Sequence, residues 1–381
     1  MKITDIRLTD TFYVPAKPQQ DAISKIPPMS MHNFCQVFTD EGLVGLVPAS
    51  GGKITKVLIE EMIKPILVGE DPMVHERIWQ KMYWGLLSTG RRGAPVIAIG
   101  IVDNAIWDLK GRITGQPVHK LLGAYRDSVP SYGSGINMNL SDDDLAAQMG
   151  GFAKAGFPMV KMKIGHHDPR RDIERIRRVR EAIGPDVDLC VDANNAWSLT
   201  AAIDIARQIE PYDIYWLEEP ILADEIDSLA QLAQATRIPI AAGENHYGKW
   251  EFRELIEKRA VTFVQADVVK CGGVTEFMKI AAMADAHGLA VCPHFSNFID
   301  VPCIAAAPNG LIHEYAADFF GPASQLLVDV AKPVAGMVAP LAKPGFGLEL
   351  RPDAADKFGT PPSGGVGRRT TDRAWRWPPY L

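Results

Sequence analysis

Apolar and polar positions divide the chain into three regions, and the middle one has the most regular pattern. From about residue 129 to residue 319, short apolar runs alternate with amphipathic stretches of helical period. The runs with the length of buried strands cover 129–135, 159–164, 188–192, 214–218, 238–244, 262–267, 290–294 and 311–315. Strands that alternate with helices predict βα units around a parallel sheet. Eight strands within about 190 residues favour a (β/α) barrel over an open sheet.

The region before this barrel has a mixed α+β pattern. Its β-like stretches and helical patterns cover 1–8, 34–47, 54–66, 74–87 and 96–114. The turn Asp40-Glu41-Gly42 predicts a hairpin. The region after the barrel is rich in Pro and Gly. The predicted divisions are an α+β domain over 1–127, the barrel over 128–320 and a C-terminal segment over 321–381.

Acidic residues stand at the ends of three successive predicted strands. Asp192, Glu218 and Glu244 lie at intervals of 26 residues, so they should occupy equivalent places on adjacent strands. The C-terminal ends of barrel strands form the face that carries active sites. Three convergent carboxylates repel one another unless a cation binds them, and Mg²⁺ is a hard cation that prefers oxygen. Each carboxylate could instead cap the following helix, but three in phase favour a metal site.

Two lysines lie in the predicted strand VKMKIG. Because side chains alternate along a strand, Lys161 and Lys163 should share one face. The outer face of a barrel strand packs on helices, so we expect both lysines to point into a polar site. Two ammonium groups beside a dication lower each other's pKa, and such a lysine can act as a general base. The alternative is that the segment is not a strand and both lysines are on the surface.

His294 and Asp267 follow neighbouring predicted strands. A carboxylate at this place can hold the imidazole by its Nδ1–H and fix its tautomer. Glu314 occupies the same position one strand later, and Asn194 should point to the same side as Asp192. The alternative for His294 is a structural role.

Composition argues against several other classes of protein. The 381 residues include 40 Lys and Arg against 46 Asp and Glu, a net charge of −6, which excludes nucleic-acid binding through a basic surface. Hydrophobic residues make up 47% and charged residues 23%, as in globular rather than disordered proteins. The five cysteines are odd in number and lack a C-x-x-C motif, which argues against disulfides and a zinc-cysteine site and fits a reducing cytoplasm. Cys190, Cys271 and Cys292 fall within or beside predicted strands, so we expect them to be small core residues. No apolar run is long enough to span a membrane, and the first residues do not resemble a signal peptide.

The motifs KMKIG, VDANNAW, WLEEP, AAGEN, ADVVKCGG, CPH and HEY resemble, in this order, the mandelate racemase subgroup of the enolase superfamily. The resemblance continues before the barrel in VDNAIWDLKGRITGQPVHKLLG. It implies a (β/α)7β TIM-like barrel and an α+β capping domain that the C-terminal segment completes. Asn194 stands where galactonate and mannonate dehydratases have a histidine, which counts against both. The residues that resemble the Mg²⁺ ligands of the family are Asp192, Glu218 and Glu244.

The resemblance also implies roles for the other strand-end residues. Lys163 resembles the base on one face of the substrate, and His294 with Asp267 resembles the acid/base pair on the other face. Glu314 resembles the acid that hydrogen-bonds a carboxylate oxygen of the substrate. Lys161 resembles a further contact to this carboxylate.

Three more positions are interpreted from the same resemblance. Asn194 resembles a contact to the α-substituent of the substrate. Lys270 matches a lysine of the family, without an assigned role. Glu219 neighbours a metal ligand, and strand alternation predicts that it points away from the site.

The implied reaction begins with removal of the proton α to a carboxylate. The main task is then to stabilise the charge of the enediolate, here by Mg²⁺, Lys161 and Glu314. If the substrate carries a β-hydroxyl, protonated His294 can expel it as water, and a 2-keto-3-deoxy acid results. Without a β-hydroxyl, reprotonation from the opposite face racemises the substrate.

The loop over residues 14–30 should cover the substrate. Its polar residues, which favour a polyhydroxylated acid, are Lys17, Gln19, Gln20, Asp21, Ser24 and Lys25. We therefore expect a cytoplasmic, homo-oligomeric, Mg²⁺-dependent dehydratase of an acid sugar, with no nucleic-acid or membrane partner. The alternatives are a racemase or epimerase of 2-hydroxy or amino acids, and a metal-binding barrel that serves as a scaffold.

Further substrate contacts are expected at residues 48–53 and around Arg91 and Arg92. The chain ends in RRTTDRAWRWPPYL. We expect its aromatic residues, Trp375, Trp377 and Tyr380, to pack against another domain or subunit, with a binding tail as the alternative.

Overall fold

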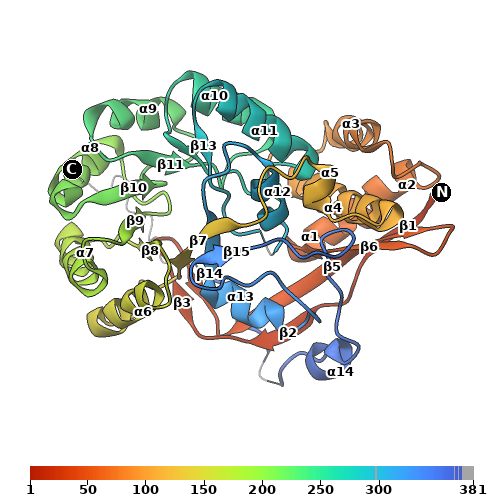
Figure 1. The fold of residues 1–381 in the computed structure, drawn as a ribbon, viewed down its shortest axis with the longest axis horizontal. Coiled ribbons are helices and arrows are strands. Elements are labelled where there is room, and N and C mark those ends of the chain that lie inside the picture. The colour runs from red at the N-terminus through yellow and green to blue at the C-terminus, as the bar shows by residue number, and fades with distance from the viewer. Residues whose placement is uncertain (297, 364, 368, 371–381) are drawn as a thin grey trace.

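The computed structural model describes residues 1–296, 298–363, 365–367 and 369–370, and it contains the predicted barrel (Figure 1). The barrel strands are β7 (Val129–Ser134), β8 (Met159–Lys163), β9 (Asp188–Asp192), β10 (Ile214–Glu218), β11 (Ile240–Ala242), β12 (Phe263–Val264), β13 (Ala290–Val291) and β14 (His313–Ala316). They are parallel and follow the order β13-β12-β11-β10-β9-β8-β7-β14. A parallel bridge between Val291 and Gly310, just before β14, joins the two ends of this order.

Seven helices connect consecutive barrel strands and surround the sheet (Figure 1). They are α6 (Asp142–Lys154), α7 (Pro169–Ile183), α8 (Leu199–Ile209), α9 (Ile226–Ala235), α10 (Gly248–Glu257), α11 (Val274–Ala286) and α12 (Asp300–Ala306), and a short η2 (Glu210–Tyr212) follows α8. In α8, Ala202, Ile205 and Ile209 are buried at intervals that place them on one helical face. The arrangement is the (β/α)7β barrel that the sequence predicts.

An antiparallel sheet from the N-terminal region caps the barrel. Its strands are β1 (Ile3–Leu8), β2 (Phe12–Pro15), β5 (Met29–Thr39) and β6 (Val44–Ala49), and β5 pairs with the other three. Phe38 pairs with Val44 across the turn at 40–42, which confirms the predicted hairpin.

The cap helices pack against this sheet. A continuous helical run consists of α1 (Gly52–Val57), the π-helical η1 (Leu58–Ile63) and α2 (Lys64–Leu67), and it is followed by α3 (His75–Leu86), α4 (Ala94–Thr114) and α5 (Val118–Leu121). Asp108 of α4 is buried and accepts the backbone N–H of Leu46 at 2.8 Å and that of Phe346 at 2.7 Å. One carboxylate thus links the helix, the cap sheet and the C-terminal segment.

Two residues of α4 bind the first turn of the barrel helix α11. Asp103 accepts the N–H of Thr275 at 2.9 Å and its hydroxyl at 2.7 Å. Asn104 accepts the N–H of Val274 at 2.9 Å. The cap therefore satisfies backbone donors that α11 cannot satisfy itself.

The predicted loop over 14–30, called the lid below, contains a small hairpin of β3 (Gln19–Gln20) and β4 (Lys25–Ile26). The backbone N–H of Met138 donates to the carbonyl of Gln20 at 2.9 Å. Met138 follows β7, so the lid rests on the carboxyl end of the barrel.

The C-terminal segment contacts both the barrel and the cap. Its elements are α13 (Ala317–Ser324), β15 (Met337–Val338) and α14 (Ala354–Phe358). β15 pairs with β7, and Thr370 bridges to Lys25 of the lid. The expectation for Trp375, Trp377 and Tyr380 lies outside the described residues.

The five cysteines are free and buried, which confirms the core positions expected for Cys190, Cys271 and Cys292. In the described part of the chain, none of the helices is both long and apolar enough to cross a membrane.

Candidate active site

Asp192, Glu218 and Glu244 come together at the carboxyl ends of three neighbouring strands. Asp192 and Glu218 end β9 and β10 and pair in register, and Glu244 follows β11 by two residues. One oxygen of each carboxylate lies within 4.8 Å of the others, and all three residues are buried. A hard divalent cation prefers such oxygen donors. The three residues form the divalent metal site that the sequence predicts.

Two lysines of β8 lie against these carboxylates, and both point into the barrel as expected. Lys161 is 1% exposed, and its Nζ lies 2.6 Å from Glu218 Oε1 and 2.9 Å from Glu314 Oε1. The Nζ of Lys163 forms an ion pair with Asp192. The site therefore contains alternating positive and negative charges with little access to water.

The carboxylates determine the direction of the lysine pKa values. Burial disfavours the charged form of Lys163, but Asp192 outweighs it, so the pKa of Lys163 lies above its usual range. Burial also disfavours the charged form of Lys161, but Glu218 and Glu314 outweigh this effect and raise the pKa of Lys161. The lowering of these pKa values beside a dication stays a prediction, because the nearby carboxylates by themselves raise them.

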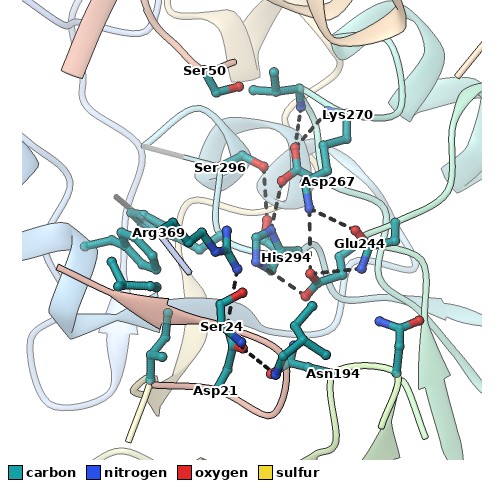
Figure 2. A pocket seen from close by; sticks show the side chains of 18 of the residues that line it. Asp21, Ser24, Ser50, Asn194, Glu244, Asp267, Lys270, His294, Ser296 and Arg369 are labelled. Carbon is teal, nitrogen blue, oxygen red and sulfur yellow. Dashed lines mark hydrogen bonds and ion pairs between the residues drawn. The ribbon is translucent and has the colours of Figure 1, made fainter. Parts of the chain in front are cut away.

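His294 and Asp267 form the predicted pair. Nδ1 of His294 lies 2.8 Å from Oδ2 of Asp267, so the carboxylate can accept its N–H. Oδ1 of Asp267 accepts the backbone N–H groups of Val269 at 2.7 Å and Lys270 at 2.9 Å, which fixes the carboxylate. Nε2 of His294 lies 3.5 Å from Glu244 (Figure 2). Burial opposes the charged imidazole, but Glu244 and Asp267 raise the pKa of His294 to about 9.

Glu314 on β14 lies between Lys161 and the strand of His294. Its Oε1 pairs with Lys161, and its Oε2 accepts the backbone N–H of Phe295 at 3.1 Å. Burial favours the neutral carboxyl, but Lys161 and His294 hold the pKa of Glu314 well below its usual range.

Asn194 is fixed beside the first metal ligand. Its backbone N–H donates to Asp192 Oδ1 at 2.8 Å, and its side chain lines the pocket described below. Its buried Oδ1 has no hydrogen-bond partner among the described residues. Asn194 thus retains an unused acceptor at the pocket wall.

The expectation that Glu219 points away from the site is wrong. Glu219 is 2% exposed and accepts hydrogen bonds from Asn195 at 2.8 Å and from Asn245 at 2.9 Å. Asn245 also donates to the metal-site residue Glu244 at 3.3 Å. Strand β10 ends at Glu218, and Glu219 has a φ of +38°, so strand alternation no longer applies to it. The signal in the sequence that points to these contacts of Glu219 is a pair of asparagines. Asn195 follows Asp192 in VDANNAW, and Asn245 follows Glu244 in AAGEN.

A pocket of about 650 Å³ joins the strand-end residues to the lid. The strand-end and loop residues in its wall are Lys163, Asn194, Glu244, Asp267, Lys270, His294, Ser50 and Gly51. Figure 2 shows Lys270, Asp267 and Glu244 on one side of this pocket, and Asp21, Ser24 and Arg369 on the other. Sequence reasoning did not identify Arg369, because no local pattern connects it to the barrel.

The lid contributes a different surface from the expected one. Asp21 and Ser24 line the pocket, but so do Ile23 and Ile26. Gln19 instead donates its side-chain amide to the carbonyl of Asp318 at 3.4 Å. The lid therefore presents both polar and apolar side chains to the pocket, and the predicted polar residues that do not line it are Lys17, Gln19, Gln20 and Lys25.

The substrate contact expected around Arg91 and Arg92 stays a prediction. Neither residue lines the pocket, and Arg92 instead pairs with Asp224 and Glu251. Its guanidinium thus joins surface segments that follow β10 and β11.

Two family models match the chain. The model described as "Mandelate racemase / muconate lactonizing enzyme, N-terminal domain" matches residues 10–123, and "Enolase C-terminal domain-like" matches residues 144–354. Together they cover most of the cap and the barrel from α6 onward, and β7 lies between the two matches.

Characterised relatives share much of the sequence. An arabinonate dehydratase of Saccharolobus solfataricus is 37% identical over 303 residues, which cover 77% of this chain and 81% of the relative. A 3,6-anhydro-alpha-L-galactonate cycloisomerase of Streptomyces coelicolor is 35% identical, covering 79% of this chain and 82% of the relative. The structure of L-talarate dehydratase from Polaromonas sp. JS666, complexed with Mg and L-glucarate, superposes with a TM-score of 0.85 at 31% identity, covering 97% and 98% of the two chains.

Proposed function

The chain belongs to the mandelate racemase/muconate lactonizing subgroup of the enolase superfamily, and from this premise we propose that it is a Mg²⁺-dependent dehydratase of an acid sugar. The substrate would be an aldonate or aldarate, and the product a 2-keto-3-deoxy acid. The observation that carries the proposal is that Lys163 and the His294–Asp267 pair line one pocket beside Glu244 of the metal site. The dehydratases among the relatives support the elimination of water.

Asp192, Glu218 and Glu244 would hold the cation. Their oxygen-only donors favour Mg²⁺, and a related structure contains Mg. When bound, Mg²⁺ supplies positive charge to the carboxylate oxygens of the substrate and offsets the protein carboxylates that raise the lysine pKa values.

Lys163 would take the proton from the carbon α to the substrate carboxylate. The electron pair of the C–H bond moves into the carboxylate and gives an enediolate. Lys161 donates hydrogen bonds to its oxygens. A substrate carboxylate beside Glu314 raises the pKa of that residue by like-charge repulsion, so that Glu314 can hold a proton and donate it in a hydrogen bond.

His294 would complete the elimination from the β-carbon. Asp267 binds Nδ1, and the proton on Nε2 is therefore the one to be donated. It passes to the β-hydroxyl, the C–O bond breaks, and water leaves. The resulting enol tautomerises to the 2-keto-3-deoxy acid, and proton exchange with solvent restores both bases.

Two other outcomes use the same first step. Reprotonation of the enediolate by His294 would make the enzyme a racemase or epimerase. A substrate whose β-oxygen belongs to a ring would be opened by the same elimination, and the similarity to a cycloisomerase favours including this outcome.

The test is incubation with Mg²⁺ in D₂O and a panel of monoacid and diacid sugars, their lactones and simple 2-hydroxy acids. We expect keto-acid formation from an acid sugar, and loss of it in Lys163→Ala and His294→Asn. The exposed Lys154→Ala and His287→Asn are matched controls. Inversion of a 2-hydroxy acid without dehydration of any acid sugar would identify a racemase, and consumption of ring compounds alone would identify a cycloisomerase. Full activity of Lys163→Ala would refute the assignment of the base.

We further propose that residues 1–127 and 321–381 together form the cap of the barrel over 128–320. The hydrogen bond from Phe346 to Asp108 and the pairing of Thr370 with Lys25 support this division. The homo-oligomeric state and the cytoplasmic location stay predictions from the sequence.

A further inference from the structure

We propose that Arg369 binds the carboxylate at the far end of a diacid substrate, so that the enzyme prefers aldarates to aldonates. The inference rests on the proposed function, because it names the substrate class of the same pocket. Arg369 lines this pocket together with Lys163 and His294.

Backbone pairing with the lid brings Arg369 to the pocket. The N–H of Lys25 donates to the carbonyl of Thr370 at 2.8 Å, and the N–H of Thr370 donates back at 3.1 Å. Gly367 runs so close to the lid that a Cβ at this position would lie 2.8 Å from the Cβ of Pro27. The segment therefore follows the lid, and the guanidinium of Arg369 reaches the pocket wall (Figure 2).

Arg369 differs from the other cationic side chains among the described residues of the pocket wall. Its side chain is 59% exposed, and its ion pair is a single contact of 3.4 Å to Oδ2 of Asp21. The other three face carboxylates of the reacting end: Lys163 pairs with Asp192, Lys270 with Glu244, and His294 with Asp267. Among the described cationic residues of the pocket wall, Arg369 is thus the one that lies apart from the reacting groups.

The chemistry of the guanidinium favours a carboxylate ligand. Oδ1 of Asp21 accepts the backbone N–H groups of Ile23 at 2.9 Å and Ser24 at 2.6 Å, so Asp21 is held by its own turn. Its contact with Arg369 takes up one of the five N–H groups of the guanidinium, which leaves others for a ligand. A carboxylate can accept two parallel N–H bonds from arginine, whereas the terminal hydroxyl of an aldonate is uncharged and cannot.

The alternative role for Arg369 is to anchor the C-terminal segment to the lid through Asp21. An anchor would affect every substrate equally, because it would act on the closure of the pocket. A ligand of the far carboxylate would affect diacids alone. The ratio of activities on matched diacids and monoacids therefore separates the two roles.

The experiment compares hexarates with hexonates that have the same configuration at C2 to C5, with Mg²⁺ present. For each pair, kcat/KM for keto-acid formation is measured in the wild type, Arg369→Met, Arg369→Lys and the exposed control Arg351→Met. We expect the wild type to prefer the diacid. Arg369→Met should lower kcat/KM for the diacid about 10- to 100-fold, because a charged hydrogen bond is lost. The same variant should change kcat/KM for the monoacid less than about twofold. For the diacid, kcat/KM of Arg369→Lys should lie between those of the wild type and Arg369→Met.

The inference is overturned if the wild type prefers the monoacid, if Arg369→Met lowers both activities by the same factor, or if it changes neither. Dehydration of hexonates alone would overturn the inference and leave the proposed function intact. If the wild type neither dehydrates any acid sugar nor exchanges its α-proton in D₂O, the proposed function fails, and the inference fails with it.

Discussion

Asp267 holds His294 through one carboxylate oxygen and the backbone of its own turn through the other. The 2.8 Å contact to Nδ1 of His294 uses Oδ2, and the N–H groups of Val269 and Lys270 bind Oδ1. Because both oxygens are engaged, the carboxylate cannot rotate without losing a partner. The imidazole therefore has a fixed orientation in which Nε2 lies on the side of Glu244.

Replacing Asp267 by Asn should impair catalysis more than the binding of Mg²⁺. The amide would not stabilise an imidazolium, so we expect kcat for dehydration to fall by about 100-fold or more, while the affinity for Mg²⁺ changes little. Steady-state kinetics and calorimetric titration with Mg²⁺ measure the two quantities. The exposed Asp285→Asn is the control, and an unchanged kcat in Asp267→Asn would contradict the role of the pair.

Glu219→Gln should weaken the metal site although Glu219 is not one of its three residues. Glutamine has one acceptor oxygen for the two donors Asn195 and Asn245, so its NH2 group would face one of them and disturb the network that orients the hydrogen bond from Asn245 to Glu244. Loss of such an outer contact weakens metal binding by roughly 10- to 100-fold. Titration calorimetry with Mg²⁺ checks this, with the exposed Glu257→Gln as control. Equal affinities in both variants would show that Asn245 does not orient Glu244.

His313 should make the fold sensitive to acid. Its Nδ1 lies 2.7 Å from Ser131 Oγ and its Nε2 3.4 Å from Asp300, and burial lowers the pKa of His313 to about 4. Between pH 6.5 and 4 the unfolded chain binds a proton at this residue that the folded chain does not, so stability falls as the pH falls through this window. Burial also raises the pKa of Asp300 to about 8, and this group contributes in the opposite direction.

The comparison of His313→Gln with the wild type reports on the histidine together with its contact to Asp300, because Asp300 itself is present in both. Relative to the variant, the wild type should lose about 3 kcal/mol of unfolding free energy between pH 6.5 and pH 4. Urea unfolding at several pH values measures the difference, and His287→Gln at an exposed position controls for loss of a histidine. Parallel pH profiles of His313→Gln and the wild type would refute the prediction.

The contact between cap and barrel at Asp103 should contribute to stability. Asp103→Ala would leave the N–H and the hydroxyl of Thr275 without this acceptor, at a cost of about 2 kcal/mol. Chemical unfolding of the variant measures this cost, with the exposed Asp204→Ala as control. Equal stability of the two variants would mean that water replaces Asp103 at the end of α11.

The carboxyl ends of the strands could be predicted from sequence because strand length and side-chain alternation are local properties. Asp192 and Glu218 are the last residues of their strands, and the structure brings Glu244 to them. The same rule fails one residue later at Glu219, because a positive φ ends the alternation and no propensity of glutamate predicts that angle.

Contacts between distant segments could not be predicted in this way. Arg369 reaches the pocket through the pairing of Thr370 with Lys25, and Asp103 reaches α11 across the boundary between cap and barrel. Neither contact leaves a periodic pattern in the chain. The apolar residues Ile23 and Ile26 enter the pocket because a hairpin forms within the lid, and two-residue strands are too short for a pattern to reveal them.

The bond between Asp108 and Phe346 has a consequence for the order in which the protein can be assembled on the ribosome. Leu46 and Asp108 emerge early in synthesis, and their hydrogen bond can form as soon as α4 meets β6. Oδ2 of Asp108 accepts from Leu46 and from Arg112 of the same helix, whereas Oδ1 accepts from Phe346, which emerges only after every strand of the barrel. The hydrogen bond between Phe346 and Asp108 can therefore form only after every strand of the barrel has been synthesised, whereas the bond between Leu46 and Asp108 can form before any of them.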